Sequence, residues 1–159
     1  SSVSDRQRVE MLTVASTGQR QLCRGQGAEL HWASNPQPLK SKEVLEIFRE
    51  KTAPAFEVAL KLGAAYAGRH EEFSEILGQY SESLGIAYQI RDDLSDLGED
   101  GETNDIEGLR PSILLAIAWE RAKGDQKPLL ESVWRRQPVP EATTESVEAL
   151  YREGKGRPL

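Results

Sequence analysis

The chain has 159 residues, of which 38% are hydrophobic and 29% charged, and its net charge of −6 comes with a single cysteine, Cys23. This size and composition predict one folded domain rather than a disordered tail, and the acidic charge argues against a nucleic-acid partner, because phosphate backbones are bound by clustered Lys and Arg. Cys23 cannot form an internal disulfide, and no run of about 18 apolar residues offers a transmembrane segment, so we expect a cytoplasmic protein.

The apolar residues recur mostly at helical spacing, and no stretch shows sustained strand alternation, so we predict an all-α protein. A first helix is predicted over residues 5–22. The segment 23–40 that follows is polar and punctuated by glycine, with Pro36 and Pro38 as breakers, and is predicted to be a connection. A second helix is expected to begin near Ser41, a capping residue before an apolar stripe. Pro54 predicts a kink or a boundary in this helix, and Gly68 its end.

A third helix is predicted over residues 70–97, and its last turns carry three aspartates. An acidic, glycine-containing loop over 98–110 follows it. The next predicted helix, over 111–123, has Pro111 in its first turn, where proline is tolerated. Residues 124–159 contain four prolines and one short amphipathic stretch at 147–152.

The three aspartates of the third helix are Asp92, Asp93 and Asp96. On a helix, Asp92 and Asp96 lie one turn apart on one face, and Asp93 lies about 100° round from Asp92. Carboxylates without a nearby His or Cys suit a hard cation, and Mg²⁺ commonly completes its ligands with substrate phosphates. Acidic groups at a helix C-terminus oppose the helix dipole and repel one another, a cost that a bound cation would offset.

Two other interpretations of the same residues stay open. Most acidic clusters at helix ends are simply solvated. A calcium loop is the second alternative, because its positions 1, 5, 6 and 12 fall on Asp96, Asp100, Gly101 and Glu107. The match is partial, since position 3 is Gly98, which has no side-chain oxygen, and position 8 is Thr103 where an apolar residue is usual.

Four segments in order resemble motifs of the trans-isoprenyl diphosphate synthases, the polyprenyl synthetase family. Residues 85–96, GIAYQIRDDLSD, resemble its second aspartate-rich motif, and residues 48–53, FREKTA, resemble its Lys-Thr-Ala motif. Residues 25–30, GQGAEL, are similar to its Gly-Gln-x-x-Asp-Leu segment. Residues 104–112, NDIEGLRPS, are similar to the segment that follows the aspartates. The resemblance implies a multi-helix bundle of the isoprenoid-synthase type, with the aspartates facing a central cavity.

The resemblance also implies roles for individual residues. The allylic diphosphate would be contacted by Lys51 and Thr52, with Gln89 supporting substrate binding, and Arg110 stands where the family has a later lysine. Mg²⁺ bound to that diphosphate would be ligated by Asp92, Asp93 and Asp96. Magnesium and Lys51 would then assist departure of the diphosphate, and the carbocation would alkylate isopentenyl diphosphate. Lys as a point charge and Thr as a hydroxyl donor are a suitable pair for a diphosphate.

The family's first aspartate-rich motif, with its paired arginines, has no counterpart in this sequence. We therefore expect residues 1–159 to form the C-terminal part of one helical domain whose N-terminal half is absent. On this hypothesis the chain is an inactive fragment that either forms the homodimer usual in the family or pairs with the missing half. The missing initiator Met is consistent with this hypothesis. The alternative is a non-catalytic helical subunit of a heteromeric prenyl synthase.

Overall fold

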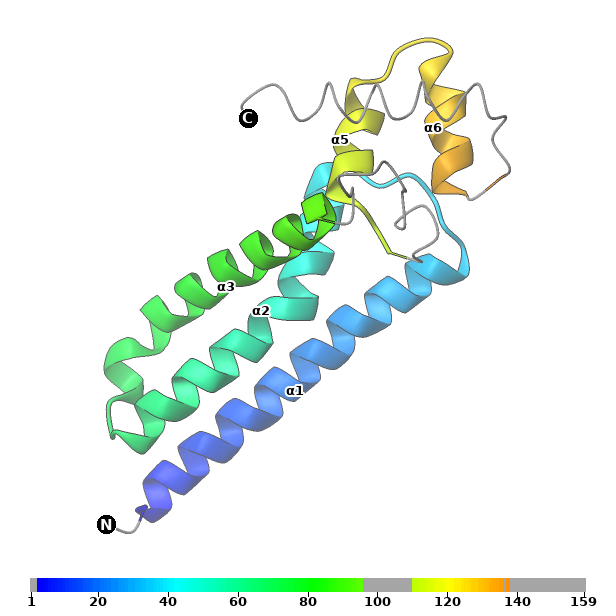
Figure 1. The fold of residues 1–159 in the computed structure, drawn as a ribbon. Coiled ribbons are helices and arrows are strands. Elements are labelled where there is room, and N and C mark those ends of the chain that lie inside the picture. Colours follow the sequence, from blue (N-terminus) through cyan, green and yellow to red (C-terminus); the bar gives the residue numbers. More distant parts are fainter. Residues whose placement is uncertain (1–2, 96–109, 136, 138–159) are drawn as a thin grey trace. The chain divides into compact units, whose positions relative to one another are not determined.

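The structure, a computed structural model, describes residues 3–95, 110–135 and 137, and every regular element in these ranges is a helix (Figure 1). The elements are α1 (Asp5–Ser34), α2 (Ser41–Tyr66), α3 (His70–Ser95), α5 (Ile113–Arg121) and α6 (Gln126–Trp134). The prediction of an all-α protein is therefore confirmed. The chain divides into two compact units, Ser1–Ala28 with Glu46–Gln89 and Glu29–Leu45 with Ile90–Leu159, and each unit is described by itself.

The first unit consists of three helical segments that lie side by side, from α1, α2 and α3 (Figure 1). At one end of the unit, the Gln7 side chain of α1 donates to the backbone oxygen of Tyr66 at the end of α2, at 2.8 Å. Nearby, Arg6 of α1 forms an ion pair with Glu71 of α3 at 2.5 Å. Small residues line the interior, and Ala53, Ala65 and Ser81 are among its buried residues.

The prediction that the first helix ends at residue 22 is wrong, because α1 continues through Gly25 and Gly27 to Ser34. A glycine inside a helix costs about 1 kcal/mol relative to alanine. Gly25 is buried against the backbone of α2, so packing between the helices offsets the cost. The helix ends only just before Pro36, which disfavours helical geometry in the residue that precedes it.

Pro54 does not end α2 but lies inside it, buried, and the helix continues to Tyr66. The true end is at Gly68, as the sequence predicts, with a left-handed φ of +72°. The amide of Gly68 donates to the Ala65 oxygen at 3.0 Å, and the amide of Arg69 donates to the Ala64 oxygen at 2.8 Å. These two bonds form a Schellman motif, which satisfies the last carbonyls of the helix and favours glycine at this position.

The second unit has a core of large aromatic and aliphatic side chains. Trp32 and Trp134 meet edge to face, with ring centroids 5.7 Å apart, and Val44 and Leu130 are fully buried. The Glu120 carboxylate of α5 accepts hydrogen bonds from the backbone amide and the hydroxyl of Ser41 at 3.0–3.2 Å. This contact ties the first turn of α2 to α5.

The helix α6 was not predicted from the sequence, which has four prolines in residues 124–159. Its Pro128 lies in the first turn, where the missing amide has no helical acceptor to lose. The amphipathic stretch predicted at 147–152, the alternative calcium loop and, except for Arg110, the loop predicted at 98–110 lie outside the described residues. The helix predicted over 111–123 is observed as α5, slightly shorter at both ends.

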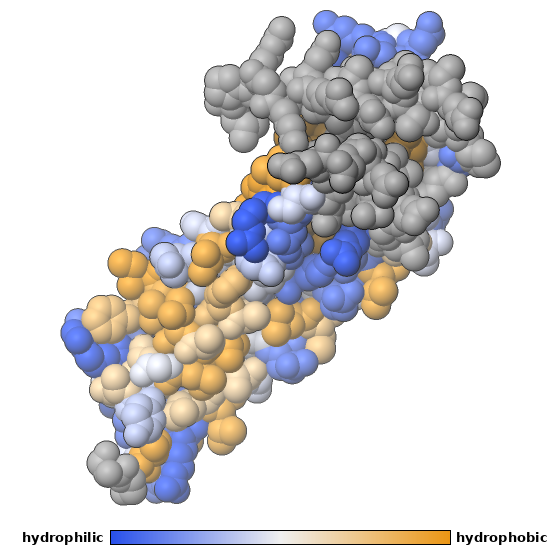
Figure 2. Space-filling model, viewed as in Figure 1, coloured by the Kyte–Doolittle hydropathy of each residue, from blue (hydrophilic) through white to orange (hydrophobic). Residues whose placement is uncertain are grey.

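Several large apolar side chains of the first unit are exposed to solvent. The exposed fraction is 70% for Leu12, 61% for Ile76 and 57% for Tyr80, and Figure 2 shows apolar side chains gathered on the visible surface over the long helices. Groups of exposed apolar residues mark interaction surfaces more often than plain surface. Among the described residues, no helix is long and apolar enough to cross a membrane.

Candidate functional site

The turn of α2 that carries Lys51 and Thr52 is in direct backbone contact with α1. A Cβ atom placed on Gly25 would lie 2.4 Å from the carbonyl carbon of Glu50 and 2.5 Å from the amide nitrogen of Lys51. Real Cβ atoms do not approach backbone atoms so closely, so only glycine allows this helix crossing. The glycine of the segment 25–30 is therefore needed for packing against the segment 48–53.

A second glycine packs against the next residue of the same turn. A Cβ atom on Gly85 of α3 would lie 2.7 Å from both the amide nitrogen and the Cα of Ala53. Residues 50–53 of α2 are thus held between Gly25 of α1 and Gly85 of α3. Three of the four sequence motifs meet at this turn, and the close contacts fix the backbone that carries the half-buried side chains of Lys51 and Thr52.

Charged residues surround this turn in the first unit. Arg24 lies 3.5 Å from the Glu50 carboxylate, and Arg49 pairs with Glu46 and, at 3.9 Å, with Glu82. The hydrogen bond that Arg49 donates to the Glu46 carboxylate is the main cause that raises the pKa of Arg49 above its usual value. A cavity of about 530 Å³ next to these pairs is lined by more carboxylates than cations and does not include Lys51, Thr52 or Gln89, so it does not suit a diphosphate.

Two of the three aspartates lie in the described part of the second unit, and they differ sharply. The Asp92 side chain is 36% exposed and lies 3.6 Å from the Arg91 guanidinium. Asp93 is buried, with an exposed fraction of 8%, and its Oδ2 atom accepts a hydrogen bond of 2.7 Å from the backbone amide of Ile113. Asp96 lies outside the described residues.

The remaining predicted residues divide between the two units. Gln89 is half-buried near the end of the α3 segment in the first unit, and Arg110 is exposed, three residues before α5 in the second. The structure thus brings Lys51 and Thr52 together on one turn and Asp92 and Asp93 together on another.

The donors near the end of α3 suit a hard cation, since Asp92 presents a partly solvated carboxylate and no His or Cys competes. Within residues 3–95 and 110–135, no group of three His, Cys, Asp or Glu side chains could hold a metal ion. Among the described residues Asp92 could provide one ligand, and Mg²⁺ usually takes others from water and substrate phosphates. This pattern agrees with the way Mg²⁺ binds phosphorylated ligands.

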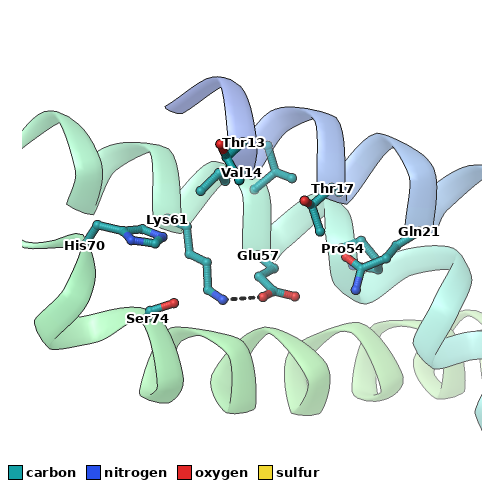
Figure 3. Close-up of a pocket in the computed structure, with 11 residues that line it drawn as sticks. Thr13, Val14, Thr17, Gln21, Pro54, Glu57, Lys61, His70 and Ser74 are labelled. Atoms are coloured by element: carbon teal, nitrogen blue, oxygen red, sulfur yellow. Dashed lines mark ion pairs between the residues drawn. The ribbon is translucent and has the colours of Figure 1, made fainter. Parts of the chain in front are cut away.

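A small cavity in the first unit, lined by both polar and apolar side chains, was not predicted from the sequence (Figure 3). It measures about 170 Å³, and Figure 3 shows Lys61 reaching toward Glu57, with a 2.5 Å ion pair, beside His70 and Ser74. Ligand pockets usually measure about 300–1,000 Å³, so this space suits a few water molecules. The cavity extends along α2 from Lys61 to Pro54, and its lining does not include Lys51 or Thr52.

Comparison with known proteins gives one consistent result. A family model described as polyprenyl synthetase matches residues 1–153. The farnesyl diphosphate synthase of Escherichia coli (strain K12) is 35% identical over 104 residues, which cover 64% of this chain and 34% of that protein. A short chain isoprenyl diphosphate synthase of Methanocaldococcus jannaschii is 29% identical over 148 residues, covering 89% of this chain and 45% of that protein.

The fold comparison agrees with the sequence comparison. The crystal structure of geranylgeranyl pyrophosphate synthetase from Pyrococcus horikoshii superimposes with a TM-score of 0.80 at 22% identity, covering 96% of this chain and 48% of the other. A decaprenyl diphosphate synthase from Rhodobacter capsulatus gives a TM-score of 0.78 at 22% identity, covering 92% of this chain and 47% of the other. The chain therefore spans less than half the length of these proteins.

Proposed function

Because the chain belongs to the polyprenyl synthetase family, we propose that it supplies the diphosphate-binding half of a prenyltransferase that joins an allylic diphosphate to isopentenyl diphosphate. The observation that carries the proposal is the turn of α2 at residues 50–53. It is held between Gly25 and Gly85, so three separate motifs converge on the backbone of Lys51. These contacts pack the helices and also fix the backbone of Lys51, as is needed for a cation held rigidly beside a phosphate.

In this proposal Lys51 donates to the diphosphate as a point charge, and Thr52 adds a hydroxyl donor. Gln89 and Arg110 contribute further donors to the diphosphate. The carboxylates of Asp92, Asp93 and Asp96 are the candidate ligands of Mg²⁺, which when bound stabilises the negative charge that develops on the leaving diphosphate. The role of these residues is therefore to bind and orient the diphosphate while its bond to the allylic carbon breaks.

We also propose that this half-site needs further helices to become active, as a C-terminal half or as a subunit. The chain spans 34% and 45% of its curated relatives, and the exposed apolar residues of the first unit offer a surface for other helices to cover. A non-catalytic subunit of a heteromeric synthase remains the second candidate, on the same two observations. A homodimer is the expected assembly in the first case.

The need for further helices has a direct test. The chain alone is expected to give no product from Mg²⁺, isopentenyl diphosphate and dimethylallyl, geranyl or farnesyl diphosphate, because one half-site cannot enclose both substrates. Radiolabelled isopentenyl diphosphate would reveal any product. Turnover by the isolated chain would contradict the proposal, and turnover only with a separate synthase chain would favour the subunit.

Diphosphate binding can be measured without turnover. Lys51→Ala is expected to weaken the binding of inorganic pyrophosphate with Mg²⁺ by about 10- to 100-fold, because a charged hydrogen bond contributes roughly 1.5–3 kcal/mol. Isothermal titration calorimetry would measure the dissociation constant. Lys42→Ala is the matched control, since Lys42 is an exposed lysine of the same helix. Equal affinities of the Lys51→Ala and Lys42→Ala variants would refute the assignment of Lys51.

A further inference from the structure

The buried carboxylate of Asp93 holds the first turn of α5. Its Oδ2 atom accepts three hydrogen bonds, from the amide of Ile113 at 2.7 Å, the amide of Leu114 at 3.3 Å and the hydroxyl of Ser112 at 3.2 Å. All these residues belong to the second unit. A carboxylate oxygen has about two lone-pair sites, so this oxygen is already saturated by protein donors.

The helix α5 needs such a partner. The first amides of any helix have no acceptor within the helix, and α5 has no acidic residue in its first turn. The side-chain oxygen of Ser112, its N-cap residue, accepts from the amide of Leu115 at 3.2 Å, one residue beyond Leu114. Asp93 therefore supplies both the missing acceptor for Ile113 and Leu114 and a negative charge at the positive end of the helix dipole.

Asp92, the neighbour of Asp93, has a different environment. Consecutive residues point about 100° apart on a helix, so the two carboxylates cannot face the same direction. Asp92 keeps 36% of its side chain exposed and pairs with the exposed Arg91. A metal ion carrying a diphosphate needs access from solvent, which Asp92 has and the buried Asp93 lacks.

We propose that the two neighbouring aspartates have different roles. Asp92 binds the metal, whereas Asp93 is a positioning residue that fixes the N-terminus of α5 and thereby the backbone next to Arg110. Arg110 lies only two residues before the Ser112 cap, so fixing the cap fixes the backbone next to Arg110. This inference replaces the expectation that Asp93 is a ligand. It rests on the proposed function for the metal and Arg110, but the contact with α5 is independent of that function.

Hydrogen exchange and ligand binding together test the division. Asp93→Asn is expected to lower the exchange protection of the Ile113 and Leu114 amides by about 10-fold or more, because a charge-assisted acceptor is lost. The Mg²⁺ concentration that half-saturates pyrophosphate binding should stay within about twofold, since no metal ligand is removed. Asp92→Asn is the matched variant and should do the reverse, raising that concentration by about 10-fold or more while leaving α5 protected.

The link through Arg110 has its own readout. At saturating Mg²⁺, Asp93→Asn is expected to weaken pyrophosphate binding by about 3- to 10-fold, and to cause no further loss in an Arg110→Ala background. A purely structural role would leave the two effects additive. If Asp93→Asn fails to fold, Ser112→Ala can replace it, because it removes only one of the three contacts of Asp93. Ser112→Ala should still lower the exchange protection of the Leu115 amide and should show the same non-additivity with Arg110→Ala.

Three results separate the hypotheses. If Asp93→Asn raised the required Mg²⁺ concentration as much as Asp92→Asn and left the α5 amides protected, Asp93 would be a ligand and the inference would be wrong. Additive effects of Asp93→Asn and Arg110→Ala would also overturn the positioning role. In the third result, the unaltered protein binds no pyrophosphate with Mg²⁺ while Asp93→Asn still lowers the exchange protection of the Ile113 and Leu114 amides. In that case the proposed function would be wrong, and the contact between Asp93 and α5 would be confirmed.

Discussion

Replacing Gly25 with alanine is expected to lower the free energy of unfolding by about 2–3 kcal/mol, near the upper end of the cost of overpacking. The new methyl group would lie 2.4 Å from the carbonyl carbon of Glu50 and 2.5 Å from the amide nitrogen of Lys51. Both contacts are to helix backbone, which cannot rotate away as a side chain can. The helices must move apart, so pyrophosphate binding by Lys51 should weaken as well.

Gly27→Ala is the control for this variant. Gly27 lies two residues along the same helix, and a Cβ atom there would meet nothing within 4 Å. Alanine has the higher helix propensity, so Gly27→Ala should be neutral or stabilising by up to about 1 kcal/mol. Urea unfolding followed by circular dichroism would compare the two variants. If Gly25→Ala were as stable as Gly27→Ala, the close helix contact would not exist in solution.

Trp134→Ala is expected to have the largest effect on stability, a loss of about 3–5 kcal/mol, as for other buried aromatic residues. Trp134 is only 1% exposed and meets Trp32 edge to face at 5.7 Å. Its removal would leave a cavity between α6 and the end of α1 within the second unit. The same unit contains Asp93, so loss of this core should also expose the α5 amides to exchange.

Trp119→Ala provides the comparison for Trp134→Ala. Trp119 is a half-buried tryptophan of the same unit, with Lys127 over its ring at 4.3 Å. Removing it deletes the same atoms but leaves less of a cavity, so the loss should be well below that of Trp134→Ala. Thermal and urea unfolding would measure both. Equal losses would show that Trp134 is not the better buried of the two.

The helices themselves could be predicted where the relevant physics is local. Gly68 ends α2 as predicted, because a left-handed residue after a helix is favoured by the hydrogen bonds of its own last turn. Gly25 does not end α1, although a helix end was predicted just before it. Its role depends on contact with the backbone of Glu50, 25 residues away, rather than on its sequence neighbours. Pro54 behaved similarly, as its local cost was outweighed by its burial within the three-helix unit.

The candidate site shows the same division. The order of motifs pointed to the polyprenyl synthetase family, and the family match confirms it. The roles of Lys51, Thr52, Gln89 and the aspartates stay predictions. The close packing of Gly25 and Gly85 against residues 50–53 could not be predicted, because nothing in the segment FREKTA indicates which glycines approach it. Nor does the sequence separate Asp92 from Asp93, which are chemically identical.

The amino-acid sequence by itself therefore determined the all-helical class, most helix ends and the carboxylates and cations available for a diphosphate. These properties depend on spacing within a few turns and on side-chain chemistry. Only the tertiary structure decided that Gly25 and Gly85 close on one turn of α2 and that Asp93 is buried at the start of α5. The reason is that burial and orphaned helix amides are satisfied by residues 20 or more positions apart, and their pairing exists only once the chain has folded.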